Sequence, residues 1–167
     1  QHKHIITAAD ISGLIEVTNS RISNLTCTLR KLGEIDDNLS INIQTDVNRI
    51  KSLPDVSDSF RQDLIQNVQQ CEALAKCLPL ENSHNVVPPS AIKRILAYLE
   101  CEKKKRLIAC MKEDLKHRIS DIDISPIKEL HPHETDDQTI ERAVFVLYAA
   151  EPDSFELKSY FQRFLLL

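Results

Sequence analysis

Apolar residues recur along the first part of the chain with spacings that alternate between four and three residues. The positions are Ile11, Ile15, Thr18, Ile22, Leu25, Leu29 and Leu32. This spacing keeps these side chains on one face of an α-helix, because successive residues are rotated by about 100 degrees. The pattern predicts a long amphipathic helix over about residues 7–32. Gly33 is expected to end it, since glycine readily adopts the left-handed backbone conformation at helix C-termini.

Two further helices are predicted before a proline-rich connector. Asp36 or Asp37 can cap a helix that runs to Leu53 and ends before Pro54. The next helix is expected to start at a capping box formed by Ser59 and Gln62. Its apolar side chains are Phe60, Leu64, Val68, Cys71 and Leu74. The connector follows at residues 78–89, where prolines lie among polar residues.

Ser90 caps a fourth predicted helix, whose apolar face changes direction partway along. The first apolar stripe consists of Ile92, Ile95, Leu96 and Leu99, and the second of Ile108, Met111, Leu115 and Ile119. The two stripes are about 150 degrees apart around the helix. Because the change falls near residues 101–106, the helix either bends there or packs its two halves on different neighbours.

Shorter helices complete the pattern. Ser125 and Pro126 resemble the N-cap and first residue of a short helix. Another helix is expected from about Asp137 to Pro152, and a last one begins with Asp153 in a capping box. The chain therefore predicts an all-α, disulfide-stapled bundle of five to seven helices that forms a single helical domain over residues 1–167.

Composition agrees with this prediction and excludes several classes of protein. The chain has 167 residues, of which 42% are hydrophobic. This length is enough for one domain with a well-buried core and too short for two stable domains. Only two glycines are present, which excludes glycine-rich phosphate loops and most turn-dense β folds. The net charge is −4 and tryptophan is absent, so we expect no nucleic-acid partner. No apolar run approaches the ~20 residues that span a bilayer.

The cysteines favour an extracellular protein, with a cytosolic protein that has free, buried thiols as the alternative. Cys71 with Cys77, and Cys101 with Cys110, are close pairs of the kind that staple helical hairpins. We expect these four to be oxidised, and nested pairing of Cys71 with Cys110 and Cys77 with Cys101 suits an antiparallel hairpin. Other connectivities stay open, and the spacings are poor for a zinc knuckle. The sequons at Asn24 and Asn38 are glycosylation candidates.

Cys27 lies on the side of the first helix opposite its apolar stripe. Gly13, Ser20 and Cys27 recur there every seven residues. Two interpretations stay open: this row of small residues lets a second helix approach closely, or Cys27 is exposed and pairs with another chain.

No arrangement of residues singles out a catalytic or metal site. His131 and His133 flank a proline without further ligands nearby, which favours a solvated loop. Asp121, Asp123 and Ser125 imitate the start of a calcium loop, but proline replaces both the required glycine and the bidentate glutamate. We expect no catalytic residues, no metal and no cofactor, and therefore no enzyme.

A basic run at Lys103, Lys104, Lys105 and Arg106 is the candidate site for an anionic partner such as a heparan-type polyanion. Glu100 and Glu102 lie four residues before Lys104 and Arg106, a spacing that also supports an ordinary exposed helix. Residues 103–118 hold seven Lys or Arg side chains, and residues 121–137 hold six acidic ones. The acidic stretch could therefore neutralise the basic one within the fold.

Six of the eight aromatic residues lie in the last 23 positions: Phe145, Tyr148, Phe155, Tyr160, Phe161 and Phe164. A C-terminal helical hairpin that closes the core is the favoured interpretation. A pocket for a hydrophobic ligand or an exposed interface is the alternative.

The leading functional hypothesis is a secreted, non-enzymatic helical module that binds a partner protein, as an effector or an inhibitor would. Long amphipathic helices, few glycines and paired cysteines support it. The alternatives are a carrier of lipids or other small hydrophobic molecules and a helical, cytokine-like signalling protein.

Overall fold

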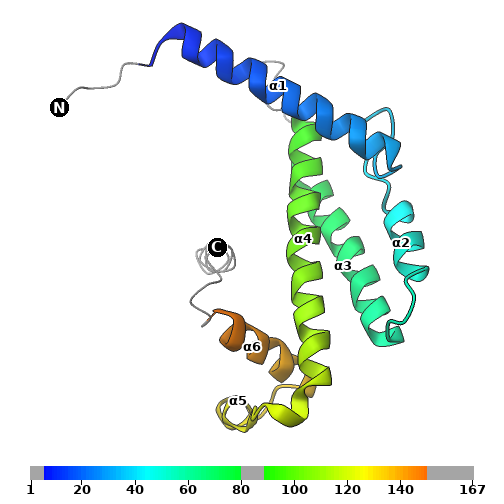
Figure 1. The fold of residues 1–167 in the computed structure, drawn as a ribbon, viewed down its shortest axis with the longest axis vertical. Helices are drawn as coiled ribbons and strands as arrows, with labels where there is room; N and C mark the ends of the chain where they lie inside the picture. Colours follow the sequence, from blue (N-terminus) through cyan, green and yellow to red (C-terminus); the bar gives the residue numbers. More distant parts are fainter. Residues whose placement is uncertain (1–5, 80–88, 150–167) are drawn as a thin grey trace, which may run out of the picture. The chain divides into compact units, whose positions relative to one another are not determined.

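The computed structural model describes residues 6–79 and 89–149, with the backbone only for 147–149. These residues form six α-helices and one short 3-10 helix, and no strand occurs among them. The helices are α1 (Ala8–Lys31), α2 (Ile43–Lys51), α3 (Asp58–Cys77), α4 (Ser90–His117), α5 (Ser125–Leu130) and α6 (Asp136–Ala149), with η1 (Ile119–Asp121) between α4 and α5 (Figure 1). The predicted all-α bundle with a disulfide is confirmed.

The chain divides into two compact units, one up to Glu102 and the other from Lys103 on. The boundary lies inside α4, at the point where its apolar face changes direction. Ile92, Ile95 and Tyr98 in its first half are buried in cores of the first unit, whereas Met111 and Leu115 belong to a core of the second. Of the two interpretations of α4, packing of its halves on different neighbours is therefore the one observed. The single domain over residues 1–167 stays a prediction.

The first unit contains two clusters of buried side chains. One brings Val47 of α2 together with Tyr98 of α4 and four residues of α3: Ile65, Val68, Cys71 and Ala75. The other joins Leu29 of α1 and Ile35 to Ile92 and Ile95 of α4. Both clusters therefore rest on the first half of α4.

Two arginines hold the helix ends of this unit by donating hydrogen bonds to backbone carbonyls. The Nη1 group of Arg61 donates to the carbonyls of Ile50, Lys51 and Leu53 at distances of 2.8–3.0 Å, which closes the α2–α3 turn. The Nε group of Arg94 donates to the carbonyl of Leu78 at 2.9 Å, at the end of α3. Both arginines thus donate to carbonyls at or just beyond a helix C-terminus, where few intrahelical donors remain.

The second unit packs α6 against the end of α4. Its core consists of Met111, Leu115, Ala143 and Val144. Isoleucines from the segment between α4 and α5, from α5 and from α6 pack against this core. Thr139 is fully buried, and its hydroxyl donates to the carbonyl of Thr135 at 3.1 Å.

Predicted helix starts are wrong at α2, α3 and α5, and the N-cap of α5 is Ile124 rather than Ser125. The second helix begins at Ile43 rather than after Asp36 or Asp37, because residues 32–42 form a turn closed by an isolated bridge between Ile35 and Ile41. Leu39, expected inside that helix, has a φ of 62°, which an α-helix cannot contain. α3 begins at Asp58, because the hydroxyl of Ser57, not of Ser59, accepts the hydrogen bond from the Phe60 N–H.

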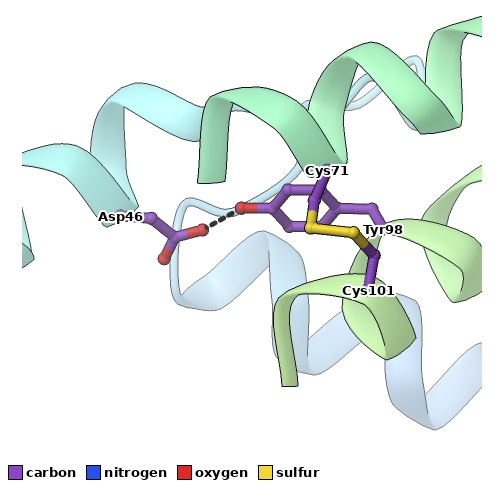
Figure 2. The surroundings of a disulfide bond; sticks show 4 residues. All are labelled: Asp46, Cys71, Tyr98 and Cys101. Atoms are coloured by element: carbon purple, nitrogen blue, oxygen red, sulfur yellow. Dashed lines mark hydrogen bonds between the residues drawn. A yellow bond between two sulfur atoms is a disulfide. The ribbon is translucent and has the colours of Figure 1, made fainter. Parts of the chain in front are cut away.

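The disulfide joins Cys71 of α3 to Cys101 of α4, and their Cα atoms are 5.5 Å apart (Figure 2). A cross-link between the third and fourth helices was predicted, but not this pairing. Cys77 and Cys110, expected to be oxidised, are free and exposed. Helix register explains the difference: with Cys71 level with Cys101, Cys110 lies about 13.5 Å further along α4 and Cys77 about 9 Å along α3. These offsets exceed the reach of a disulfide in the nested arrangement.

Candidate functional site

The two halves of α1 lie in different environments although they share one apolar stripe. In the C-terminal half, Leu29 is only 5% exposed and packs with Ile92 and Ile95 of α4. Ile22 and Leu25 are half-buried against the same cluster. The stripe therefore enters the first unit's core near Ile22.

The N-terminal half of α1 carries large apolar side chains that the described residues leave exposed. Leu14 is 67% exposed, and Ile11, Val17 and Ile15 are 54%, 49% and 44% exposed. We call these four residues the α1 face. Isolated exposed apolar residues are common, but four within two helical turns form a contiguous patch, which is typical of an interaction surface.

The start of α1 is held by a complete capping box. The Thr7 N–H donates to Asp10 Oδ2 at 2.8 Å, and the Asp10 N–H donates to Thr7 Oγ1 at 3.2 Å. The hydrogen bond from the Thr7 side chain, followed by the one from its backbone, holds the pKa of Asp10 below its usual value. The α1 face is thus presented on a helix with a defined start rather than on a fraying end.

Charged side chains flank the α1 face asymmetrically. At about 100 degrees per residue, Asp10 and Arg21 fall on the same edge as Leu14 and Val17, whereas Glu16 lies on the far side. Asp10 and Arg21 are both exposed. One edge of the face therefore carries a negative charge at one end and a positive charge at the other.

The row of small residues on α1 is not covered by another described helix. A Cβ atom added at Gly13 would meet nothing within 4 Å, and Ser20 and Cys27 are exposed. Of the two interpretations of this row, close approach of a second helix is thus not observed among the described residues. Cys27 has a free, exposed thiol.

A buried tyrosine lies beside the disulfide (Figure 2). Tyr98 is 2% exposed, and its hydroxyl donates to Asp46 Oδ2 at 2.6 Å. Burial, together with this hydrogen bond, raises the pKa of the Tyr98 hydroxyl far above its usual value. Arg49 pairs with Asp46 within α2 and with Glu34 of the preceding turn, whereas the Tyr98 hydrogen bond ties α2 to α4. The arrangement stabilises the fold and places no reactive group in solvent.

A cavity of about 400 Å³ lies in the first unit between the 38–41 turn, α3 and the start of α4. Leu39, Ile41, Ala75 and Ala91 form its apolar walls, and its charged groups are Arg94 and the ion pair of Lys76 with Glu72. Its volume lies in the range of small-molecule sites. Neither the cavity nor its cations were foreseen from the sequence, since its walls come from three separate segments.

The basic run lies on α4, immediately after the boundary between the two units. Lys103 and Arg106 are exposed, whereas Lys104 and Lys105 are half-buried. Further along, Lys112 and Lys116 pair with Asp137, and their hydrogen bonds lower the pKa of that carboxyl. Acids of the following stretch therefore do neutralise part of the basic stretch. Binding of a polyanion stays a prediction.

The sequence motifs weighed as metal sites have ordinary structural roles. Glu134 pairs with Arg142, and Asp123 Oδ1 accepts a hydrogen bond from the Ser125 N–H at 2.9 Å at the start of α5. His131 and His133 lie in the turn before α6. No group of three or more His, Cys, Asp or Glu that could hold a metal ion occurs in the described ranges.

The aromatic C-terminus is largely outside the described residues. Phe145 is half-buried on α6, and the backbone of Tyr148 is in the same helix. Phe155, Tyr160, Phe161 and Phe164 lie outside the described residues, so their role as core, pocket or interface stays a prediction.

Both candidate glycosylation sites are exposed. Asn38 lies in the turn between α1 and α2, whereas Asn24 lies within α1. The Thr26 hydroxyl of the Asn24 sequon is buried and donates to the carbonyl of Ile22 at 2.9 Å. Asn38 is thus the more accessible acceptor in the folded chain.

Because the apolar stripe of α1 is continuous in the sequence, its pattern did not reveal that the α1 face is exposed. A signal was present, because the four-three spacing is maintained for three heptads, longer than a small core needs. In the part of the chain that the structure describes, no helix is long and apolar enough to cross a membrane. Comparison with known proteins finds no matching family model, no matching curated protein and no matching solved structure.

Proposed function

We propose that this protein is a secreted, non-enzymatic binding module that pairs the α1 face with an amphipathic helix of a partner protein. The single observation that carries the proposal is the exposure of Ile11, Leu14, Ile15 and Val17 on a capped helix. Leaving these side chains in water is unfavourable, by roughly 25 cal/mol per Å² of apolar surface. A partner that covers them gains this free energy.

The chemistry of the partner follows from the spacing of the stripe. Residues that alternate at four and three positions form the a and d positions of a heptad, whose side chains pack between those of another helix. The C-terminal half of the same stripe already packs on a helix, since Leu29 contacts Ile92 and Ile95 of α4. An amphipathic helix is therefore the partner element that suits the N-terminal half.

The extracellular location is supported by the Cys71–Cys101 disulfide, because such bonds persist in oxidising compartments. Glycans on Asn38 or Asn24 would accompany secretion. Mass spectrometry of the protein from its natural source, before and after enzymatic deglycosylation, tests both points together. A reduced, unmodified protein would contradict them.

Affinity capture with three baits tests the binding function: the wild-type protein, Leu14→Glu and, as matched control on the opposite side of α1, Ser20→Glu. A captured protein is purified and titrated by calorimetry. We expect binding at least ~10-fold weaker for Leu14→Glu, which corresponds to about 1.4 kcal/mol, and unchanged binding for Ser20→Glu. Equal affinity for all three baits would show that the α1 face is not the binding surface.

The cavity of about 400 Å³ favours a second candidate function, that of a carrier for small amphipathic molecules. Ala91→Leu would fill the cavity, and Ala73→Leu at an exposed position of α3 is its control. Native mass spectrometry should then show a co-purified ligand retained by the control variant and lost from Ala91→Leu. If the wild-type protein, Ala91→Leu and Ala73→Leu all lack a ligand, the carrier function is excluded.

A further inference from the structure

We infer that the partner helix of the α1 face is α1 of a second copy of this chain, paired antiparallel about a two-fold axis level with Gly13. The inference rests on the proposed function, because it takes the α1 face as the binding surface. It goes further by naming the occupant and the register of the pair.

The length of the exposed segment suits self-pairing. The stripe is exposed from the start of α1 at Ala8 to Ile15, is half-buried at Thr18 and enters the first unit's core near Ile22. An antiparallel copy centred at Gly13 places its Ala8 opposite Thr18. The α1 helix of the second copy therefore does not extend along the covered half of α1 in the first copy. The first unit of each copy lies beyond one end of the paired segment.

This register brings apolar residues together in every central position. Ile11 of one copy lies opposite Ile15 of the other, and the two-fold axis generates a second, identical contact between Ile15 of the first copy and Ile11 of the second. In antiparallel helix pairs, residues that directly precede an a position meet their own counterparts across the axis. Leu14 directly precedes Ile15, which is an a position. The most exposed side chain of the α1 face therefore meets Leu14 of the second copy.

Charge complementarity supports the same arrangement. Asp10 and Arg21 lie on the Leu14 edge of α1, before and after the axis. Antiparallel pairing turns the Arg21 end of one copy toward the Asp10 end of the other on this edge, with the two residues offset by five positions, about 7.5 Å along the helix axis. Each end of this edge therefore combines opposite charges, which attract over that distance without forming an ion pair. A parallel pair would set like charges at the same level, because equal residues are then level with each other.

A mixing experiment tests the pairing through Leu14, using the full chain with its exposed thiols alkylated so that Cys27 forms no cross-links. Sedimentation equilibrium of the wild-type protein should show a concentration-dependent dimer. Leu14→Glu and Leu14→Lys should each weaken dimerisation at least ~10-fold, because like charges then meet on the axis. An equimolar mixture of the two variants should recover the dimer. Ser20→Glu should dimerise as the wild type does.

Each other outcome overturns the inference. A wild-type protein that stays monomeric at the highest concentration reached excludes the second copy as occupant, while α1-dependent binding of a different purified protein would leave the proposed function intact. A dimer unaffected by Leu14→Glu excludes the α1 face as its interface. Failure of the mixture to recover excludes the antiparallel register, provided that circular dichroism shows wild-type helicity for both variants.

Discussion

The two halves of α1 show how one sequence pattern can serve two purposes. Both halves carry the same four-three repeat of apolar residues on a continuous helix. Leu29 is 5% exposed because α4 lies against it, whereas Leu14 is 67% exposed. The repeat therefore predicts a helix with an apolar face, but the cover of that face depends on which other elements reach it.

The largest expected effect comes from removing the disulfide that holds α4, the helix on which the covered half of α1 packs. The Cys71–Cys101 disulfide closes a segment of 30 residues and joins α3 to α4, on which Leu29 packs. Replacing both cysteines by alanine should lower the free energy of unfolding by ~3.6 kcal/mol, from the loop-closure entropy of the unfolded chain. Urea denaturation measures it. Stability equal to that of the wild type would show that the cores alone fix the two helices.

Leu29→Ala and Leu14→Ala test the comparison directly. Leu29→Ala leaves a cavity against Ile92 and Ile95 and should cost about 3 kcal/mol of unfolding free energy. Leu14→Ala on the exposed half should change the unfolding free energy of the monomer by no more than ~0.5 kcal/mol. Chemical denaturation at dilute protein concentration provides both values. Similar costs for the two variants would mean that the halves of α1 are buried to the same degree.

Tyr98→Phe removes a polar contact from the core that α4 shares with α2 and α3, next to the core that holds the covered half of α1. The substitution deletes the hydroxyl that donates to Asp46 at 2.6 Å and leaves the ring in place. We expect a loss of about 1–2 kcal/mol of unfolding free energy, because a part-buried carboxylate then lacks one of its donors. Equilibrium unfolding near neutral pH measures it. A neutral effect would mean that Arg49 alone satisfies Asp46.

The smallest effect is an acid transition confined to the exposed half. Hydrogen bonds from Thr7 lower the pKa of Asp10, so the capping box contributes stability above the pKa of the unfolded carboxyl, about 3.9. This contribution is lost as the pH falls through the lower folded pKa. Amide exchange followed by NMR should therefore show lower protection factors over residues 8–14 at low pH, while residues 25–31 stay protected. Asp10→Asn should abolish the pH dependence of protection in the first segment, and an equal loss of protection in both segments would contradict the prediction.

Two other regions show where sequence reasoning succeeded and where it did not. The change of apolar face on α4 was visible because rotation along a helix is regular, and the structure assigns its two stripes to different units. The start of α2 was misplaced because Leu39 extends the apolar period into a turn where its φ is 62°. The period alone cannot distinguish a helical leucine from one that reaches the same core from a turn.

The sequence by itself determined the helical class, the extents of α1 and α4, and the expectation of a cross-link between the third and fourth helices. These follow from local geometry, since helical periodicity, caps and prolines act within a few residues. Only the tertiary structure decided that Cys71 pairs with Cys101 and that the α1 stripe is covered from Ile22 onward. Both depend on the register and reach of helices far apart in the chain, and no local pattern encodes how far one helix extends beyond its neighbour.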